Sequence, residues 1–74
     1  MKNAHLINAL IKKLEGEIAV AEANVSVYLN NPAGIGEHSD IVEAIESEVL
    51  KMAEAKDKLE VCKLILHPFE NVKN

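Results

Sequence analysis

The stretch that most constrains this chain runs from Asn30 to Asp40, because it separates two long segments of helical character. Pro32 has no amide proton to continue a helix, and it pushes the preceding residue out of the helical region. Gly34 and Gly36 permit the positive φ angles that a compact loop uses. We therefore expect the chain to double back here and to join two antiparallel helices.

The remaining residues of this turn have a structural or a functional interpretation. Ile35 lies between the two glycines, and we expect it to fold back over the ends of both helices. Asp40 and the earlier Ser39 are competing N-caps of the second helix, and His38 is interpreted as a turn or capping residue. The turn is either a site of specific contact or only a rigid connection, and both interpretations stay open.

The first helix is expected to span about residues 3–30. Its apolar side chains recur at alternating spacings of three and four, which is the pattern of a heptad stripe. The stripe comprises Ala4, Ile7, Ile11, Leu14, Ile18, Ala21, Val25 and Tyr28. Gly16 is the weak helical position and lies away from the stripe. It is either a tolerated surface glycine or a place where a neighbouring helix approaches closely.

The second helix is expected to span about residues 39–66, because Pro68 stops it near Leu66, and residues 67–74 form a tail. The predicted stripe comprises Val42, Ile45, Val49, Met52, Ala55, Leu59, Cys62 and Leu66. Between Met52 and Leu59 the strict heptad would place Lys56 at the contact between the two helices, which we call the seam. We therefore expect Ala55 to take that position through a local change of twist.

The two helices carry more apolar surface than a two-helix contact can cover. The surplus residues, which are candidates for an interaction surface, are Leu6, Leu10, Val20, Val27, Val61, Leu64 and Ile65. A chain of 74 residues forms one small domain with a modest core, and its single cysteine excludes an internal disulfide. The expected fold is thus an all-α antiparallel hairpin, residues 1–74, that pairs into a dimeric four-helix bundle.

Composition argues against several classes of function. The net charge of −4 and the absence of arginine disfavour a nucleic-acid partner. No apolar run has the length of a membrane span or the form of a signal peptide, so we expect no membrane partner and a cytoplasmic location. A lone cysteine also agrees with a reducing compartment.

No arrangement of residues predicts catalysis, a cofactor or a metal site. Cys62 lies on the apolar stripe, where a thiol is normally inert, and nothing orients His38 and Ser39 as a catalytic pair. His5, Cys62 and His67 would approach the open end of the hairpin, but they have no metal-site spacing. The Gly-Ile-Gly sequence lacks the Gly-Lys-Ser/Thr ending of a phosphate loop.

The segment from Asn31 to Ile41 resembles small uncharacterised helical proteins encoded by marine bacteriophages. This resemblance implies a phage-encoded accessory protein in the host cytoplasm, and it brings no catalytic residue with it. We therefore expect a non-catalytic structural or interaction protein that self-associates through aliphatic helix faces. The alternatives are a small regulator that binds a host protein, and a metal-dependent enzyme assembled in a symmetric bundle.

Overall fold

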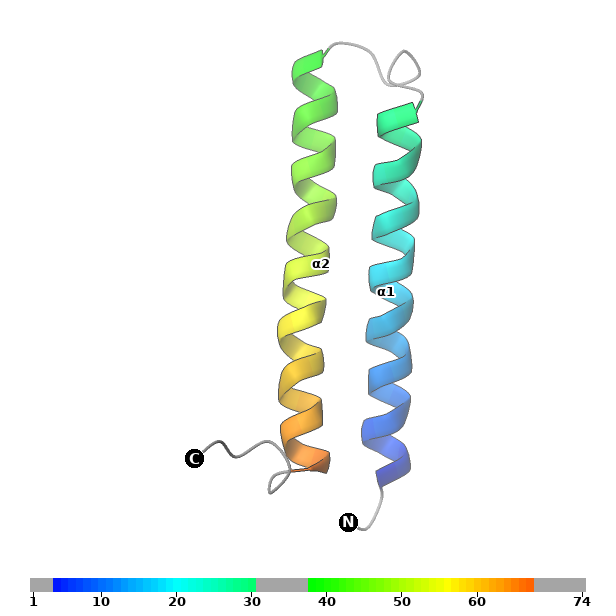
Figure 1. The fold of residues 1–74 in the computed structure, drawn as a ribbon, viewed down its shortest axis with the longest axis vertical. Coiled ribbons are helices and arrows are strands. Elements are labelled where there is room, and N and C mark those ends of the chain that lie inside the picture. The colour runs from blue at the N-terminus through cyan, green and yellow to red at the C-terminus, as the bar shows by residue number, and fades with distance from the viewer. Residues whose placement is uncertain (1–3, 31–37, 68–74) are drawn as a thin grey trace.

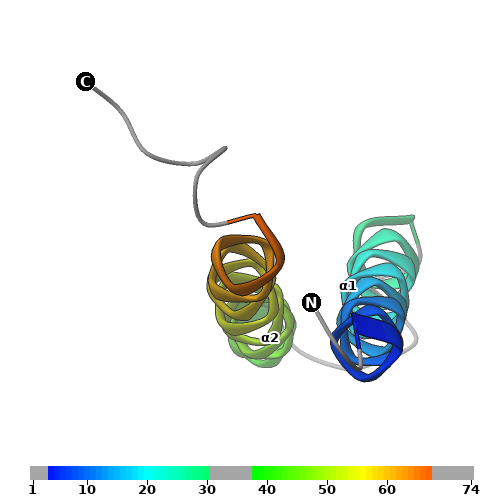
Figure 2. The same cartoon turned by 90° about the horizontal axis from the view of Figure 1, so that it is seen from below.

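The computed structural model describes residues 4–30 and 38–67, which form two α-helices, α1 (Ala4–Asn30) and α2 (His38–Leu66). The helices pack side by side and antiparallel, so the predicted all-α hairpin is confirmed (Figure 1). Seen along the helices, they form a single layer (Figure 2). The predictions for Pro32, Gly34, Ile35, Gly36 and the tail beyond His67 lie outside the described residues.

The face that α1 presents to α2 is the predicted heptad stripe. Each of its eight residues, from Ala4 to Tyr28, is buried or half-buried, while most residues between them are exposed. Leu14 is the largest fully buried side chain, with 1% of its surface exposed. It packs in one cluster with Ala55 and Cys62 of α2. The spacing alone therefore located this side of the seam correctly.

The predicted stripe of α2 is wrong at two positions and in its twist. Val42 and Val49 are exposed by 65% and 50%, and Ile41 and Glu48 are buried in their place. The seam residues of α2 are Ile41, Ile45, Glu48, Met52, Ala55, Leu59, Cys62 and Leu66. Their spacing alternates between four and three without a break, so no shift of the stripe is needed. The charge of Glu48 concealed this regular pattern.

The charges at the helix ends agree with the helix dipole only in α2. Asp40 lies in its first turn and Lys63 in its last turn, where each charge stabilises a helix. The last turn of α1 contains no basic residue. There the Asn30 side-chain amide donates hydrogen bonds to the Ser26 carbonyl at 2.8 Å and to the Ser26 hydroxyl at 3.2 Å. These contacts satisfy polar groups at the end of α1 next to the predicted turn.

Gly16 is exposed, and a Cβ atom at this position would meet nothing within 4 Å. Within the hairpin it is therefore a surface glycine and not a point of close helix approach. We expect Gly16→Ala to raise the free energy of unfolding by about 1 kcal/mol, because alanine loses less backbone entropy in a helix. Urea denaturation followed by circular dichroism measures this change. A loss of stability would instead indicate a close approach by another chain.

Candidate interaction surface

The seven candidate residues for an interaction surface are all exposed in the hairpin. Four further large apolar residues are exposed that the sequence reasoning did not single out. These are Leu29, Val42, Val49 and Leu50. The eleven side chains are between 40% and 65% exposed, which is a large apolar surface for two helices.

A groove of about 310 Å³ lies between the helices near the open end of the hairpin. We call it the open-end groove, and its lining residues are Ile7, Leu10, Asp57, Lys58, Val61, Cys62 and Ile65. The structure thus brings together Leu10, Val61 and Ile65, three of the seven candidate residues for an interaction surface. Leu6 and Leu64 are exposed but do not line the groove.

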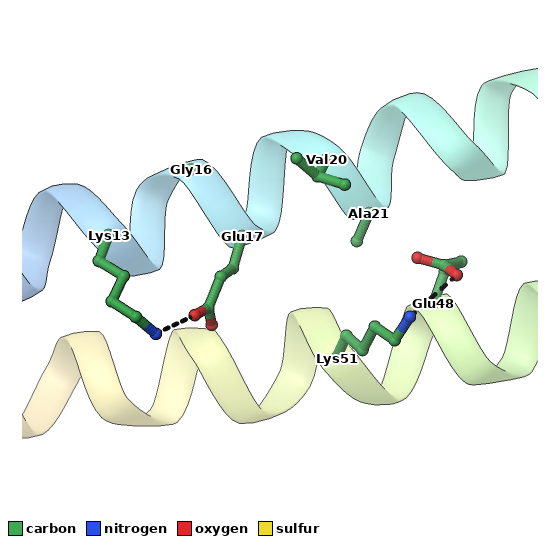
Figure 3. Close-up of a pocket in the computed structure, with 7 residues that line it drawn as sticks. All are labelled: Lys13, Gly16, Glu17, Val20, Ala21, Glu48 and Lys51. Carbon is green, nitrogen blue, oxygen red and sulfur yellow. Dashed lines mark hydrogen bonds and ion pairs between the residues drawn. The ribbon is translucent and has the colours of Figure 1, made fainter.

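A second groove, of about 460 Å³, lies near the middle of the hairpin and is called the middle groove (Figure 3). Its lining residues are Lys13, Gly16, Glu17, Val20, Ala21, Glu48 and Lys51. Figure 3 shows Lys13 and Glu17 reaching from α1 toward α2, and Glu48 lying between the helices beside Ala21. This groove is more polar than the open-end groove, because an ion pair and a carboxylate line it.

Both grooves lie on the same face of the hairpin, which we call the groove face. Leu10 lines one groove and Glu17 the other, and residues seven apart project from the same side of a packed helix. The same spacing relates Lys51, Lys58 and Ile65 on α2. By this rule Leu6 and Val27 also project on the groove face, because they lie seven residues from Lys13 and Val20.

The opposite face of the hairpin carries fewer apolar residues. Leu29, Val42 and Val49 each directly follow a seam residue, which places them on the other side of the seam. The equivalent positions along both helices are occupied by the charged residues Glu15, Glu22, Lys56 and Lys63. The apolar residues therefore gather on the part of this face next to the turn, and charged residues occupy the rest of it toward the open end.

The ion pair in the middle groove joins neighbouring turns of α1. Lys13 Nζ donates to Glu17 Oε2 at 2.5 Å. This hydrogen bond is the main cause that lowers the pKa of Glu17, and the positive charges of Lys13 and Lys58 act in the same direction. The pair is solvent-accessible, so its charges are already screened by water in the isolated hairpin.

Glu48 is the feature of this surface that the sequence reasoning missed. Its side chain lies in the seam and the residue is only 5% exposed. Asn24 Nδ2 donates to Glu48 Oε1 at 3.1 Å, and Lys51 Nζ lies 3.4 Å from Glu48 Oε2. Among the described residues, every buried side-chain nitrogen or oxygen has a hydrogen-bond partner. The uninterrupted heptad through Glu48 was the signal that could have located it.

Two of the residues considered for chemistry, His38 and Cys62, lie on α2. Cys62 is buried in the apolar seam, as predicted, and packs in the cluster with Leu14. No three His, Cys, Asp or Glu side chains in residues 4–30 and 38–67 lie close enough to hold a metal ion. His38 begins α2, and its side chain and that of Ser39 lie outside the described part of the structure.

No known protein family, curated protein or solved structure matches this chain. Neither described helix contains an apolar stretch long enough to cross a membrane. The surface itself is therefore the basis for a functional proposal. What distinguishes it is the set of exposed aliphatic side chains and the two grooves between the helices.

Proposed function

We propose that the protein is a non-catalytic structural or interaction protein that self-associates through its aliphatic helix faces. The observation that carries this proposal is that eleven large apolar side chains of the described helices are exposed on a two-helix layer. Scattered apolar residues are normal on a protein surface, but a concentration of them typically marks an interface. A second copy of the chain is a natural partner, because it exposes the same excess of apolar side chains and is stabilised by burying them.

The accessible area supports an interface of ordinary size. The 8.1 kDa chain exposes 5721 Å². A folded monomer of this mass exposes about 4,500 Å², so the surplus is about 1,200 Å². A stable interface buries about 800 Å² on each partner, and obligate dimers bury more. One dimer contact would therefore bring the exposed area per chain into the range of ordinary folded proteins.

The thinness of the hairpin explains why association would stabilise it. Its Cα atoms span 14 Å in the shortest direction, and among the described residues Leu14 is the only large side chain that is fully buried. A single layer of helices buries one stripe of each helix and leaves the other faces in water. A second layer would convert the exposed face of the first into the core of a four-helix bundle.

Sedimentation equilibrium of the wild-type protein over a wide concentration range tests this proposal. We expect a mass of twice 8.1 kDa at micromolar concentration and a melting temperature that rises with concentration. A well-folded species of 8.1 kDa at millimolar concentration would contradict self-association. The exposed aliphatic surface would then be assigned to another protein, as in the host-regulator alternative.

The biological setting proposed for this assembly is a phage-infected host cell. It is supported by the resemblance of residues 31–41 to marine bacteriophage proteins, and residues 31–37 of that segment lie outside the described structure. An accessory protein of this kind would act in the host cytoplasm. Affinity capture from host lysate, performed beside the mass measurement, tests whether a host protein competes with the second copy.

A further inference from the structure

We propose that the second copy docks on the groove face, with the open ends of both hairpins at the same end of the dimer. The two-fold axis then runs parallel to the helices, and α1 of each copy packs against α2 of the partner. This inference rests on the proposed self-association, and it adds which face is buried and how the two copies are oriented.

The distribution of apolar residues favours the groove face. Four of the eleven exposed large apolar residues line the two grooves, namely Leu10, Val20, Val61 and Ile65, and Leu6 and Val27 lie seven residues from the groove residues Lys13 and Val20. The opposite face has three, Leu29, Val42 and Val49, all near the turn, and the rest of that face is charged. The groove face is also hollowed at two places, so it can receive side chains of a second copy. Burial of this face therefore removes the most apolar area from water.

The Asn24–Glu48 hydrogen bond defines which residues of the two helices lie at the same level. Because the helices are antiparallel, each step toward the start of α1 matches a step toward the end of α2. Leu10 therefore lies near the level of Val61, and Leu6 near the level of Ile65. With the axis parallel to the helices, these residues of α1 face their aliphatic counterparts on α2 of the partner.

Charges in the middle of the groove face support the same orientation. Counting from the same hydrogen bond, Glu17 lies at a level between Lys51 and Lys58. When α1 packs against α2 of the partner, Glu17 falls between the partner's Lys51 and the partner's Lys58. The carboxylate would then gain opposite charges from the second copy, and the lysines would keep a counter-charge on burial.

A dimer with its axis perpendicular to the helices is less favourable. In that arrangement α1 packs on α1 of the partner and the open end of one copy covers the turn end of the other. Val61 would then face the level of the partner's Ser47 and Glu48, where α2 is polar. The most apolar end of each hairpin would thus bury polar groups instead of the matching aliphatic groups.

Two matched substitutions test the choice of face. Val61→Lys places a charge on the groove face and Val49→Lys places one on the opposite face, at positions that are 55% and 50% exposed in the hairpin. Both side chains are exposed, so both variants are expected to remain helical by circular dichroism. We expect Val61→Lys to weaken dimerisation by at least about tenfold, because an ammonium group would be buried without a partner. Val49→Lys is expected to leave the dissociation constant nearly unchanged.

The opposite result would overturn the inference about the face and leave self-association standing. If Val49→Lys dissociates the dimer and Val61→Lys does not, the copies associate through the other face. If the wild-type protein is already a folded monomer, the proposed function itself fails. The sedimentation experiment separates these two outcomes, because the wild-type protein is measured beside both variants.

Energy transfer between labelled copies tests the orientation. Ala9 and Ala23 are exposed on α1 and accept cysteine substitutions for labelling, whereas the native Cys62 is buried in the seam. With a donor at position 9 of one copy, an acceptor at position 9 of the partner lies at the same level along the helix axis. An acceptor at position 23 lies about 21 Å further along it. We expect more efficient transfer for the 9–9 pair, and more efficient transfer for the 9–23 pair would show a perpendicular axis.

Discussion

Leu14→Asp is expected to unfold the hairpin, with a loss of more than about 4 kcal/mol in the free energy of unfolding. Leu14 is 1% exposed and packs at the centre of the seam with Ala55 and Cys62. The substitution removes its apolar contacts and places a carboxylate where no donor or cation lies in the cluster. Thermal and urea denaturation followed by circular dichroism at fixed protein concentration measure the loss.

Leu50→Asp is the matched control for this prediction, because it makes the same chemical change on α2 at a side chain that is 60% exposed. Leu50 lies outside the seam and lines neither groove, so its replacement is expected to change stability by less than about 1 kcal/mol. Leu14→Ala, which creates a cavity without a charge, is expected to cost about 2–5 kcal/mol. Equal effects of Leu14→Asp and Leu50→Asp would contradict the position of the seam.

Asn24→Leu is expected to lower the free energy of unfolding by about 1.5–3 kcal/mol, because it removes a hydrogen bond to a charged and buried group. Glu48 would then keep only Lys51, whose nitrogen is 3.4 Å away and whose side chain is largely exposed. In the double variant Asn24→Leu, Glu48→Leu no polar group is left unsatisfied. We expect its stability to equal or exceed that of the wild-type protein, as found when buried ion pairs are replaced by apolar residues.

Urea denaturation of the single and double variants gives the coupling between the two positions directly. Asn8→Leu is the control for the change in helix propensity, because Asn8 is exposed on α1, the helix that carries Asn24. If Asn24→Leu lowers the free energy of unfolding by no more than this control does, burial of the Glu48 carboxylate does not depend on the hydrogen bond from Asn24. The hydrogen bond would then have no role in the stability of the seam.

The Asn24–Glu48 pair also has a consequence for specificity. Aliphatic heptads can slide by a full repeat without changing the type of contact, whereas a polar pair in the seam is satisfied in one register only. We infer that this pair selects the observed alignment of α1 with α2. A more stable double variant that forms several species by sedimentation would agree with this role.

The two sides of the seam were not equally predictable. The stripe of α1 contains only apolar side chains, so its spacing alone located every member from Ala4 to Tyr28. In α2 the seam includes Glu48, which a search for apolar residues rejects. Val42 and Val49 were chosen in place of Ile41 and Glu48, and an apparent shift near Lys56 followed from that choice. The seven surplus residues could be named from the sequence, because a helix that buries one stripe leaves its other apolar residues exposed.

The sequence by itself determined that the chain forms two long helices, because helix formation depends on side chains three and four residues apart. It also determined the buried stripe of α1, since every residue there is apolar. Only the tertiary structure decided the seam of α2 and the position of the two grooves. The reason is that burial of the Glu48 carboxylate depends on an amide donor 24 residues earlier in the chain, which no local pattern can reveal.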